Sequence, residues 1–422
     1  MAESRLHPHD DLAPVGGGER IELLDMVRGF ALAGILLANL VSFAGYYVTS
    51  PARLAASPTA RLDALTVAWM NLAVEGKFYS LFSLLFGVGF ALQMRRTEQR
   101  GADFRRLFLR RMGALLGLGL FHLLLLWHGD ILTLYALMGM VLLLFRRVSD
   151  HALAGWTVGL LFIPLLLQLA MMSTGSALDP TPPFQALSRA IQDVAGGPGA
   201  TLFSLRSSDD AGQVFLGNLA NAVQRPGSYL RTGRPAQVLS MFVLGVWVAR
   251  QLLPDPLRHR RLLVRVLAGG LLLGVPANAV YAWSSARTGA SFALTPAGLA
   301  QTAAYAVGVV PLALAYASGL ALLWGTMPGR RVLSCFVPLG RMALTNYLGQ
   351  TLLGLLLFYG YGLNLMGKVG MVWVLPLTAL VLLAQWGVSV LWLRHHAHGP
   401  VEALWRRLTY GRAAPRPRVS TT

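Results

Sequence analysis

The feature that most constrains this chain is a pair of apolar stretches that follow one another between Met112 and Phe145. The first reads MGALLGLGLFHLLLLW, the second reads ILTLYALMGMVLLLF, and only the tripeptide HGD separates them. As helices, both approach the length of about 20 residues that crosses a bilayer, so we predict a membrane-spanning hairpin. Ionisable side chains are costly in or beside hydrocarbon and commonly mark functional sites there. The hairpin places His122, His128 and Asp130 in this position.

The composition agrees with a chain surrounded mostly by lipid. Of its 422 residues, 55% are hydrophobic and 13% are charged, whereas about 25% are charged in an average soluble protein. The single cysteine, Cys335, excludes a disulfide framework and a multi-cysteine metal centre, and we predict no metal site. The formal net charge of +18 comes from arginines at the ends of apolar stretches rather than from a separate basic module. We therefore predict the lipid bilayer as a partner, and no nucleic acid.

Further apolar stretches predict an all-α fold, a polytopic transmembrane helical bundle of about ten spans. The segment Arg95–Arg111 carries seven arginines against two acidic residues. The positive-inside rule therefore places this segment and both termini in the cytoplasm, and the HGD turn on the outer side. Besides the two spans of the hairpin, the predicted spans are Phe30–Val48, Leu72–Met94, Leu153–Met172, Ala236–Leu253, Leu263–Trp283, Leu299–Gly325, Met342–Phe358 and Met371–Leu393.

The spans and polar stretches divide the chain into five predicted regions. They are a disordered cytoplasmic arm (1–20), a first group of five spans (21–173), an outer cap (174–235), a second group of five spans (236–393) and a basic cytoplasmic tail (394–422). Within the cap, Phe184–Val194 and Val214–Val223 are predicted as short amphipathic helices. In the tail, Gly399–Gly411 is predicted as an amphipathic helix on the inner leaflet, with membrane anchoring as its simplest role. Gly113 and Gly117 have the spacing that permits close helix approach.

Five ordered motifs resemble the YeiB-like family of largely uncharacterised bacterial inner-membrane proteins. The resemblance runs nearly from end to end, and it implies a multi-pass protein of the bacterial inner (plasma) membrane without implying an activity. The motifs are RIELLDMVRGFALAGILLANL (Arg20–Leu40), EGKFYSLFSLLFGVGFAL (Glu75–Leu92), GDILTLYALMG (Gly129–Gly139), GRMALTNYLGQT (Gly340–Thr351) and GPVEALWRRLTYG (Gly399–Gly411).

The first motif also has a more distant resemblance to the transmembrane acyltransferase superfamily. That group includes sugar O-acyltransferases and the lysosomal enzyme that acetylates terminal glucosamine of heparan sulfate. The shared feature is Asp-x-x-Arg-Gly before an apolar stretch, here at Asp25 and Arg28. In O-acyltransferases a catalytic histidine follows the basic residue after ten others. This chain has Asn39 at that position after Arg28, and it has Ser50 after ten further residues, so neither position is a histidine. A histidine elsewhere would have to take that role.

Three residues near the outer side are the candidate catalytic groups. His122 could act as the base that activates a sugar hydroxyl or an amine; its simpler interpretation is a hydrogen bond between helices. Asp130 could orient His122 or bind substrate, or it could simply cap the helix that follows. Glu75 could share a proton with Asp130 if the two carboxyl groups face one another. His128 is interpreted as part of a solvated turn.

The candidate substrate-binding residues lie toward the cytoplasm and on the ninth span. Arg28 and Arg341 could hold the phosphates of an acyl-CoA, although a local ion pair with Asp25 and topology-setting charge are the simpler interpretations. The first-span motif adds Asn39 to this set. The predicted polar wall of the pocket consists of Asn346, Tyr347 and Gln350, which could alternatively join neighbouring helices.

Three functions remain open at this point. The first is a membrane-bound acyltransferase that moves an acyl group from cytoplasmic acyl-CoA to an extracytoplasmic sugar or lipid acceptor. The second is a transporter or flippase for a small or lipid-linked molecule, and the third is a non-catalytic membrane partner protein. We expect no tightly bound cofactor, with acyl-CoA as the co-substrate of the first function. The acyl group, the acceptor and the oligomeric state, including a homo-oligomer, are left open by the sequence.

Overall fold

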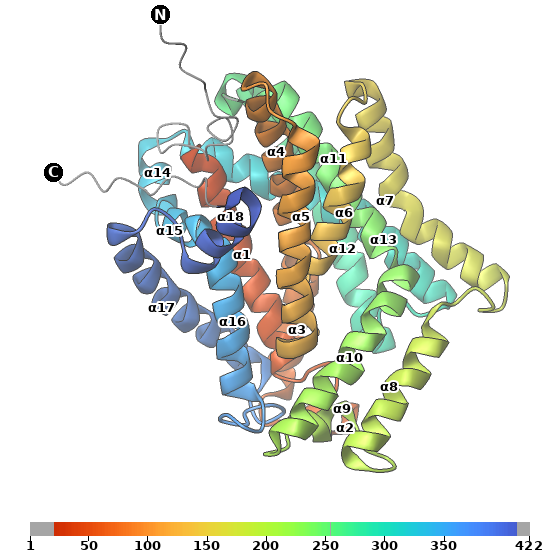
Figure 1. The fold of residues 1–422 in the computed structure, drawn as a ribbon. Helices are drawn as coiled ribbons and strands as arrows, with labels where there is room; N and C mark the ends of the chain where they lie inside the picture. The colour runs from red at the N-terminus through yellow and green to blue at the C-terminus, as the bar shows by residue number, and fades with distance from the viewer. Residues whose placement is uncertain (1–20, 254, 412–422) are drawn as a thin grey trace, which may run out of the picture.

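The computed structural model describes residues 21–253 and 255–411, which form helices joined by turns, with no strand among them (Figure 1). This confirms the all-α prediction. The predicted arm, 1–20, and the last part of the predicted tail, 412–422, lie outside the described residues. The longer helices are α1 (Glu22–Phe43), α3 (Ala60–Ala73), α4 (Lys77–Gln99), α5 (Phe104–Phe121), α6 (Leu132–Leu142), α7 (Asp150–Ser173), α8 (Thr181–Gly196), α10 (Ala211–Thr232), α11 (Arg234–Leu252), α12 (Arg260–Thr288), α13 (Pro296–Trp324), α16 (Ala343–Phe358), α17 (Val374–His395) and α18 (Pro400–Tyr410).

Seven helical stretches in the described part of the chain are long and apolar enough to cross a membrane. Each corresponds to a predicted span. Two more predicted spans are shorter apolar helices, at 132–145 and 343–358, and the remaining one is the 19-residue α11. The structure therefore supports a membrane protein, while the count of ten spans stays a prediction. The seven stretches are Glu22–Phe43, Ala60–Gln99, Phe104–Leu126, Asp150–Ser173, Pro256–Thr288, Pro296–Trp324 and Met371–His395.

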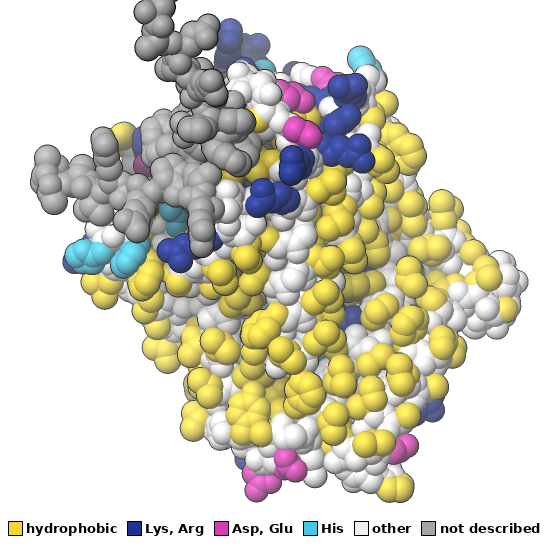
Figure 2. Space-filling view, in the orientation of Figure 1, with side chains coloured by type: hydrophobic (Ala, Val, Ile, Leu, Met, Phe, Trp, Pro, Cys, Tyr) yellow, Lys and Arg dark blue, Asp and Glu magenta, His cyan; other side chains and the backbone are white. Residues whose placement is uncertain are grey.

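The surface shows the same division into an apolar body and a basic end. Figure 2 shows hydrophobic side chains over the middle of the visible face, with Lys and Arg side chains gathered at its upper end. The helices α14 (Met327–Leu333), α15 (Phe336–Arg341) and α18 lie at that end in Figure 1, whereas α8, α9 (Leu202–Arg206) and α10 lie at the opposite end. We call these the arginine-rich end and the cap end.

The predicted cap contains the two predicted helices, and both are longer than the sequence indicated. Phe184–Val194 lies within α8, and Val214–Val223 lies within α10. The two helices pack against each other, and α10 also contacts the π-helical turn His122–Leu126 that ends the first half of the central hairpin. Through this contact the cap covers the polar turn of the hairpin.

A tight turn interrupts the stretch predicted as a single span from Leu72 to Met94. Helix α3 ends at Ala73 and α4 begins at Lys77, and Gly76 between them has φ of 85°. Residues other than glycine rarely adopt this conformation. A Cβ at Gly76 would also overlap the Tyr305 hydroxyl. The turn therefore depends on glycine and on a side chain more than 200 positions later, which the local apolar pattern did not reveal.

Close helix contacts occur at glycines other than the predicted pair. Among the described residues, a Cβ added at Gly113 or Gly117 would meet no heavy atom of another helix within 4 Å, so the prediction for them was wrong. A Cβ at Gly340 would instead overlap the carbonyl oxygen of Asp25, and one at Gly29 would overlap that of Phe336. These reciprocal contacts bring α1 and α15 together backbone to backbone. Gly87 and Gly245 make the same kind of contact between α4 and α11.

Candidate functional site

Two halves of the chain meet at a buried chain of three polar side chains. His122 Nδ1 lies 2.9 Å from Asp130 Oδ1, and His122 Nε2 lies 2.9 Å from Thr351 Oγ1. The exposed fractions of His122, Asp130 and Thr351 are 0%, 2% and 1%. The predicted meeting of His122 with Asp130 is thus present, and α16 supplies a third member, Thr351, that our sequence reasoning did not name.

Asp130 combines the two roles that the sequence left open. Its Oδ1 accepts a hydrogen bond from the Leu132 amide at 3.1 Å, and its Oδ2 accepts one from the Thr133 amide at 2.7 Å. The carboxylate therefore caps the first turn of α6 while it binds His122. Because the backbone amides hold the carboxylate in place, the orientation of His122 is also defined.

The contacts indicate the tautomer of His122. An ionised carboxylate only accepts hydrogen bonds, so Asp130 favours a proton on Nδ1. In the neutral imidazole, Nε2 then carries the lone pair and accepts from the Thr351 hydroxyl. This is the arrangement in which a histidine can take a proton from a hydroxyl at Nε2, with the aspartate stabilising the imidazolium that forms.

A π-helical turn aims His122 at these partners. The turn covers His122–Leu126, directly after α5, and Trp127 then adopts an extended conformation. Such turns are rare and often occur at functional sites. The Trp127 indole is itself buried and lies edge-on to His122, with ring centroids 6.3 Å apart.

His128 is buried, so its interpretation as a solvated turn residue was wrong. Its Nδ1 accepts a hydrogen bond from Arg206 Nη2 at 3.1 Å, and its backbone amide donates to Asn218 Oδ1 at 2.7 Å. Arg206 and Asn218 belong to the cap, which closes over the turn. Burial, helped by the nearby charges of Arg206 and Arg225, holds the pKa of His128 well below its ordinary value of 6.5.

We expect His128 to make the stability of the protein depend on pH. The unfolded chain binds a proton at this residue below pH 6.5 whereas the folded chain does not, so the free energy of unfolding falls as the pH drops below 6.5. The slope from one such group is at most about 1.4 kcal/mol per pH unit. Thermal unfolding of His128→Asn between pH 5 and pH 8 should show a weaker pH dependence than the wild type. His151→Asn, at an exposed position on α7, is the matched control and should leave the dependence unchanged.

Glu75 does not join Asp130, in contrast to the proton-sharing arrangement considered from the sequence. No hydrogen bond or ion pair joins the two among the described residues, and Asp130 is engaged by His122 and the α6 amides. Glu75 lies in the α3–α4 turn, where its charge acts on Lys77 and Arg234. Lys77 is fully buried and donates to the Asn71 carbonyl at 2.7 Å.

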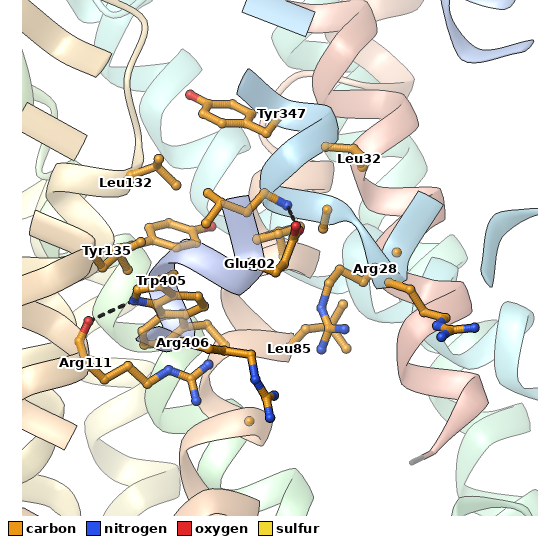
Figure 3. A pocket seen from close by; sticks show the side chains of 18 of the residues that line it. Arg28, Leu32, Leu85, Arg111, Leu132, Tyr135, Tyr347, Glu402, Trp405 and Arg406 are labelled. Atoms are coloured by element: carbon orange, nitrogen blue, oxygen red, sulfur yellow. Dashed lines mark hydrogen bonds between the residues drawn. The ribbon is translucent and has the colours of Figure 1, made fainter. Parts of the chain in front are cut away.

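A cavity of about 280 Å³ leads from the arginine-rich end toward the buried histidine. Four arginines line its entrance, and we call Arg28, Arg111, Arg341 and Arg406 the arginine mouth. In Figure 3 Tyr347 lies at the top of the view, and the labelled Arg28, Arg111 and Arg406 lie below it. The interior is mainly apolar, with Leu32, Ile35, Phe82, Leu85, Phe86, Phe90, Phe108, Leu115, Ile131, Leu132, Tyr135 and Tyr347 among its lining residues.

The far end of the cavity adjoins the histidine through Tyr347. The rings of Tyr347 and His122 have centroids 5.2 Å apart, and the Tyr347 hydroxyl donates to the Gly129 carbonyl at 3.3 Å. Ile131 and Leu132, which directly follow Asp130, line the same part of the cavity. His122 and Asp130 are not among the residues that line this cavity, so an apolar molecule that filled it would end at Tyr347, whose ring neighbours that of His122.

The predicted tail helix, α18, forms one wall of the cavity rather than only lying on the membrane surface. Trp405 lines the cavity, stacks under the Arg111 guanidinium at 4.3 Å and donates to the Arg111 carbonyl at 3.0 Å. Glu402 accepts hydrogen bonds from the Leu344 and Thr345 amides at the start of α16. Helix α18 thus ties the arginine mouth to the helix that carries Tyr347 and Thr351.

Only some of the predicted binding residues line the cavity. Arg28 and Arg341 line the cavity, although Arg28 is also paired with Asp25 at 2.5 Å, as the simpler interpretation required. Asn39 is half-buried on α1 and is not a lining residue. Tyr347 lines the cavity, but Asn346 and Gln350 hydrogen-bond to Ser389 and Gln385 on α17. Those two amides therefore join α16 to α17 and form no cavity wall.

The described residues contain no group of three or more His, Cys, Asp or Glu side chains placed to hold a metal ion. Sequence reasoning missed Thr351, Arg111, Glu402 and Trp405. Thr351 is the last residue of the GRMALTNYLGQT motif, so its place in a motif was the available signal. The contact of Arg111 with Trp405 joins residues 294 positions apart and has no local signature.

Comparisons with known proteins identify relatives that are similar over most of the length of the chain. Residues 247–412 match a family described as "Protein of unknown function (DUF418)". The chain is 34% identical over 407 residues to the uncharacterized protein YxaH of Bacillus subtilis, covering 94% of this chain and 96% of that protein. It is 32% identical over 418 residues to the uncharacterized protein YeiB of Escherichia coli, covering 94% of this chain and 98% of that protein. These findings confirm the predicted YeiB-like resemblance.

Proposed function

Since this chain belongs to the DUF418 family of YeiB and YxaH, whose names state no activity, we propose its function from its site: a membrane-bound acyltransferase. In this proposal an acyl-CoA enters from the cytoplasm at the arginine mouth, and an extracytoplasmic sugar or lipid accepts the acyl group near His122. The positive-inside rule supports this orientation, because the arginine-rich end then faces the cytoplasm. The proposed location is the bacterial inner membrane, with both termini cytoplasmic.

The observation that carries the proposal is the position of the cavity between the arginine mouth and the surroundings of His122. It opens among four arginines, continues between apolar side chains and ends at Tyr347, 5.2 Å from the His122 ring. Guanidinium groups bind phosphates well because they present several donors in a planar fork. A phosphorylated molecule with an apolar arm matches both halves of this cavity.

The size of the cavity limits which part of an acyl-CoA it can hold. At about 280 Å³ it lies near the lower end of ligand pockets, which range from about 300 to 1,000 Å³. The pantetheine arm with a short acyl group is the part we assign to it. The nucleotide phosphates would remain at the arginine mouth, where Arg28 and Arg111 offer positive charge.

The buried polar chain supplies the chemistry for transfer to a hydroxyl or an amine. The acceptor replaces Thr351 at His122 Nε2 and gives its proton to that nitrogen while its oxygen or nitrogen attacks the thioester carbonyl. The carbon–sulfur bond then breaks, and the CoA sulfur takes the proton from the imidazolium and leaves as a thiol. Asp130 holds the Nδ1 proton and stabilises the charged ring throughout.

Replacing Arg28 with glutamine should weaken acyl-CoA binding by about tenfold or more, because a charge-assisted contact to phosphate is lost. The measurement is the thermal shift of the detergent-purified protein in a titration with acetyl-CoA, with dephospho-CoA as a second ligand. Arg106→Gln removes the same charge from an exposed position on α5 outside the cavity, and should bind like the wild type.

The same titration separates the proposal from its alternatives. A flippase for an anionic lipid would use the cavity too, and it would respond to lipid phosphates but not to acetyl-CoA. A protein without this function would show equal, small shifts for wild type, Arg28→Gln and Arg106→Gln. Either result would remove the support for acyl-CoA as the co-substrate.

A further inference from the structure

We propose that Arg206, with His128, Trp127 and Tyr359, forms a binding site for a carboxylate or phosphate group at the cap end of the molecule. We call these four residues the cap cluster. We identify this ligand with the anionic group of the acyl acceptor, and this identification rests on the proposed acyltransferase function.

The guanidinium of Arg206 is buried without an opposite charge. Its side chain is 1% exposed, and no carboxylate in the described part of the chain lies within salt-bridge distance of it. Its neighbours are the neutral His128 ring and the face of Tyr359, whose centroid lies 5.8 Å from the guanidinium carbon. Buried charges in proteins are normally paired, because removing an ion from water is costly. An anionic ligand would provide the missing charge.

Several buried donors in the cap cluster also lack partners. Arg206 Nε has no hydrogen-bond partner among the residues that the structure describes, and Trp127 Nε1 and the Tyr359 hydroxyl lie close to one another without forming a hydrogen bond of good geometry. These atoms belong to neighbouring side chains, since Arg206 lies over the Tyr359 ring and Trp127 is adjacent to the His128 ring at 5.4 Å. Buried polar groups are nearly always satisfied. N–H and O–H groups gathered beside a guanidinium suit the oxygens of a carboxylate or phosphate.

The backbone holds Arg206 firmly in this position. The Gly360 amide donates to the Arg206 carbonyl at 2.9 Å, and Asn364 Nδ2 donates to the Ser207 carbonyl at 3.3 Å. A Cβ at Gly360 would overlap the Ser208 carbonyl oxygen, so the two segments approach as closely as glycine allows. These contacts fix the backbone that carries Arg206, and the hydrogen bond from Nη2 to His128 holds its guanidinium group. Such preorganisation is typical of binding sites on rigid elements.

The cap cluster adjoins the proposed catalytic pair through Trp127 and His128. Trp127 lies edge-on to His122, and His128 is two residues before Asp130. Arg225 of α10 donates to the Asp130 carbonyl at 3.4 Å, which brings a second cation to the same region. An acceptor anchored here by its anion would lie next to His122. We therefore assign the acceptor to the class of carboxylate- or phosphate-bearing sugars and lipids.

The test compares anion binding by the detergent-purified full-length protein and its Arg206→Met variant. Thermal unfolding is measured in titrations of sodium phosphate and of sodium acetate, with sodium chloride keeping the ionic strength constant. We expect the wild type to show a saturable rise of about 2–4 °C with phosphate or acetate. Arg206→Met should lose this rise and should be at least as stable as the wild type in chloride alone, because it buries no unpaired charge.

Two further variants keep the test decisive. Arg189→Gln removes an exposed arginine from α8 of the same cap and should retain the full response. Arg206→Lys keeps the charge but lacks the planar fork, so it should bind about tenfold more weakly, and it carries the test if Arg206→Met does not fold. A rise that persists in both Arg206 variants would assign anion binding to the arginine mouth and overturn the proposal. Equal effects of chloride, acetate and phosphate on the wild type would also overturn it.

Loss of anion binding and loss of acyl transfer are distinguishable results. If Arg206→Met abolishes the anion response while the wild type shows no acetyl-CoA binding, the cap site stands and the acyltransferase proposal fails. If acetyl-CoA binds and acyl transfer occurs equally in wild type and Arg206→Met, the enzyme proposal stands and the acceptor assignment fails.

Discussion

Replacing His122 with glutamine is expected to lower acyl transfer by a factor of about 10²–10⁴. Glutamine can still hydrogen-bond to Asp130 or Thr351, but it cannot take up the proton of the acceptor. Asp130→Asn should cause a loss of similar size, because the amide NH2 can donate to Nδ1 and so favour the other tautomer, and because a neutral amide does not stabilise the imidazolium. The measurement is transfer of a radiolabelled acetyl group from acetyl-CoA to lipid and glycan fractions in membranes that contain each variant.

The design separates chemistry from folding. Size-exclusion chromatography and thermal unfolding in detergent show whether His122→Gln is folded, and acetyl-CoA binding shows whether its cavity is intact. His151→Gln, at an exposed site on α7, is the control and should transfer at the wild-type rate. A folded His122→Gln protein with at least half of the wild-type transfer rate would exclude His122 as the base.

Replacing Gly340 with alanine is expected to lower the free energy of unfolding by about 1–3 kcal/mol, the usual cost of overpacking a filled contact. The added methyl group would overlap the Asp25 carbonyl oxygen of α1, so α1 and α15 must separate. Small residues allow membrane helices to pack closely, and the packing itself is the main source of their association. Because Asp25, Arg28 and Arg341 border the cavity, the separation should also weaken acetyl-CoA binding.

The matched control is the same substitution at Gly113 of α5. In the described part of the chain, a Cβ there meets no atom of another helix within 4 Å, so only the helix propensity changes. Gly113→Ala should therefore raise the free energy of unfolding by about 0.5–1 kcal/mol. Reversible unfolding of both variants in mixed micelles gives the two values. Effects of the same sign and size would show that the α1–α15 contact is not as close as the structure has it.

The helices of this protein were largely predictable, because local composition decides which segments enter lipid. Every predicted span overlaps a helix, although a turn at Gly76 divides the span predicted from Leu72 to Met94, and both predicted cap helices and the predicted tail helix are present. The pairing of His122 with Asp130 was also within reach, since the two residues flank one short turn of the hairpin. For the same reason Asp130 could be recognised as a cap for the helix that follows it.

The breaks and contacts between distant segments could not be predicted in the same way. The turn at Gly76 depends on Tyr305, the position of Trp405 depends on Arg111, and the burial of His128 depends on Arg206 in the cap. Each of these contacts joins residues that are far apart in the sequence, so no local pattern records it.

The sequence alone therefore determined that this is an all-helical membrane protein with ionisable residues near one turn, because hydrophobicity and charge act residue by residue. Only the tertiary structure decided that Thr351 completes the polar chain, that Glu75 is separate from Asp130, and that four arginines open an apolar cavity. Those facts depend on which helix faces lie against one another. Side-chain packing and backbone approach at glycines set these relations, and both arise only when the helices assemble.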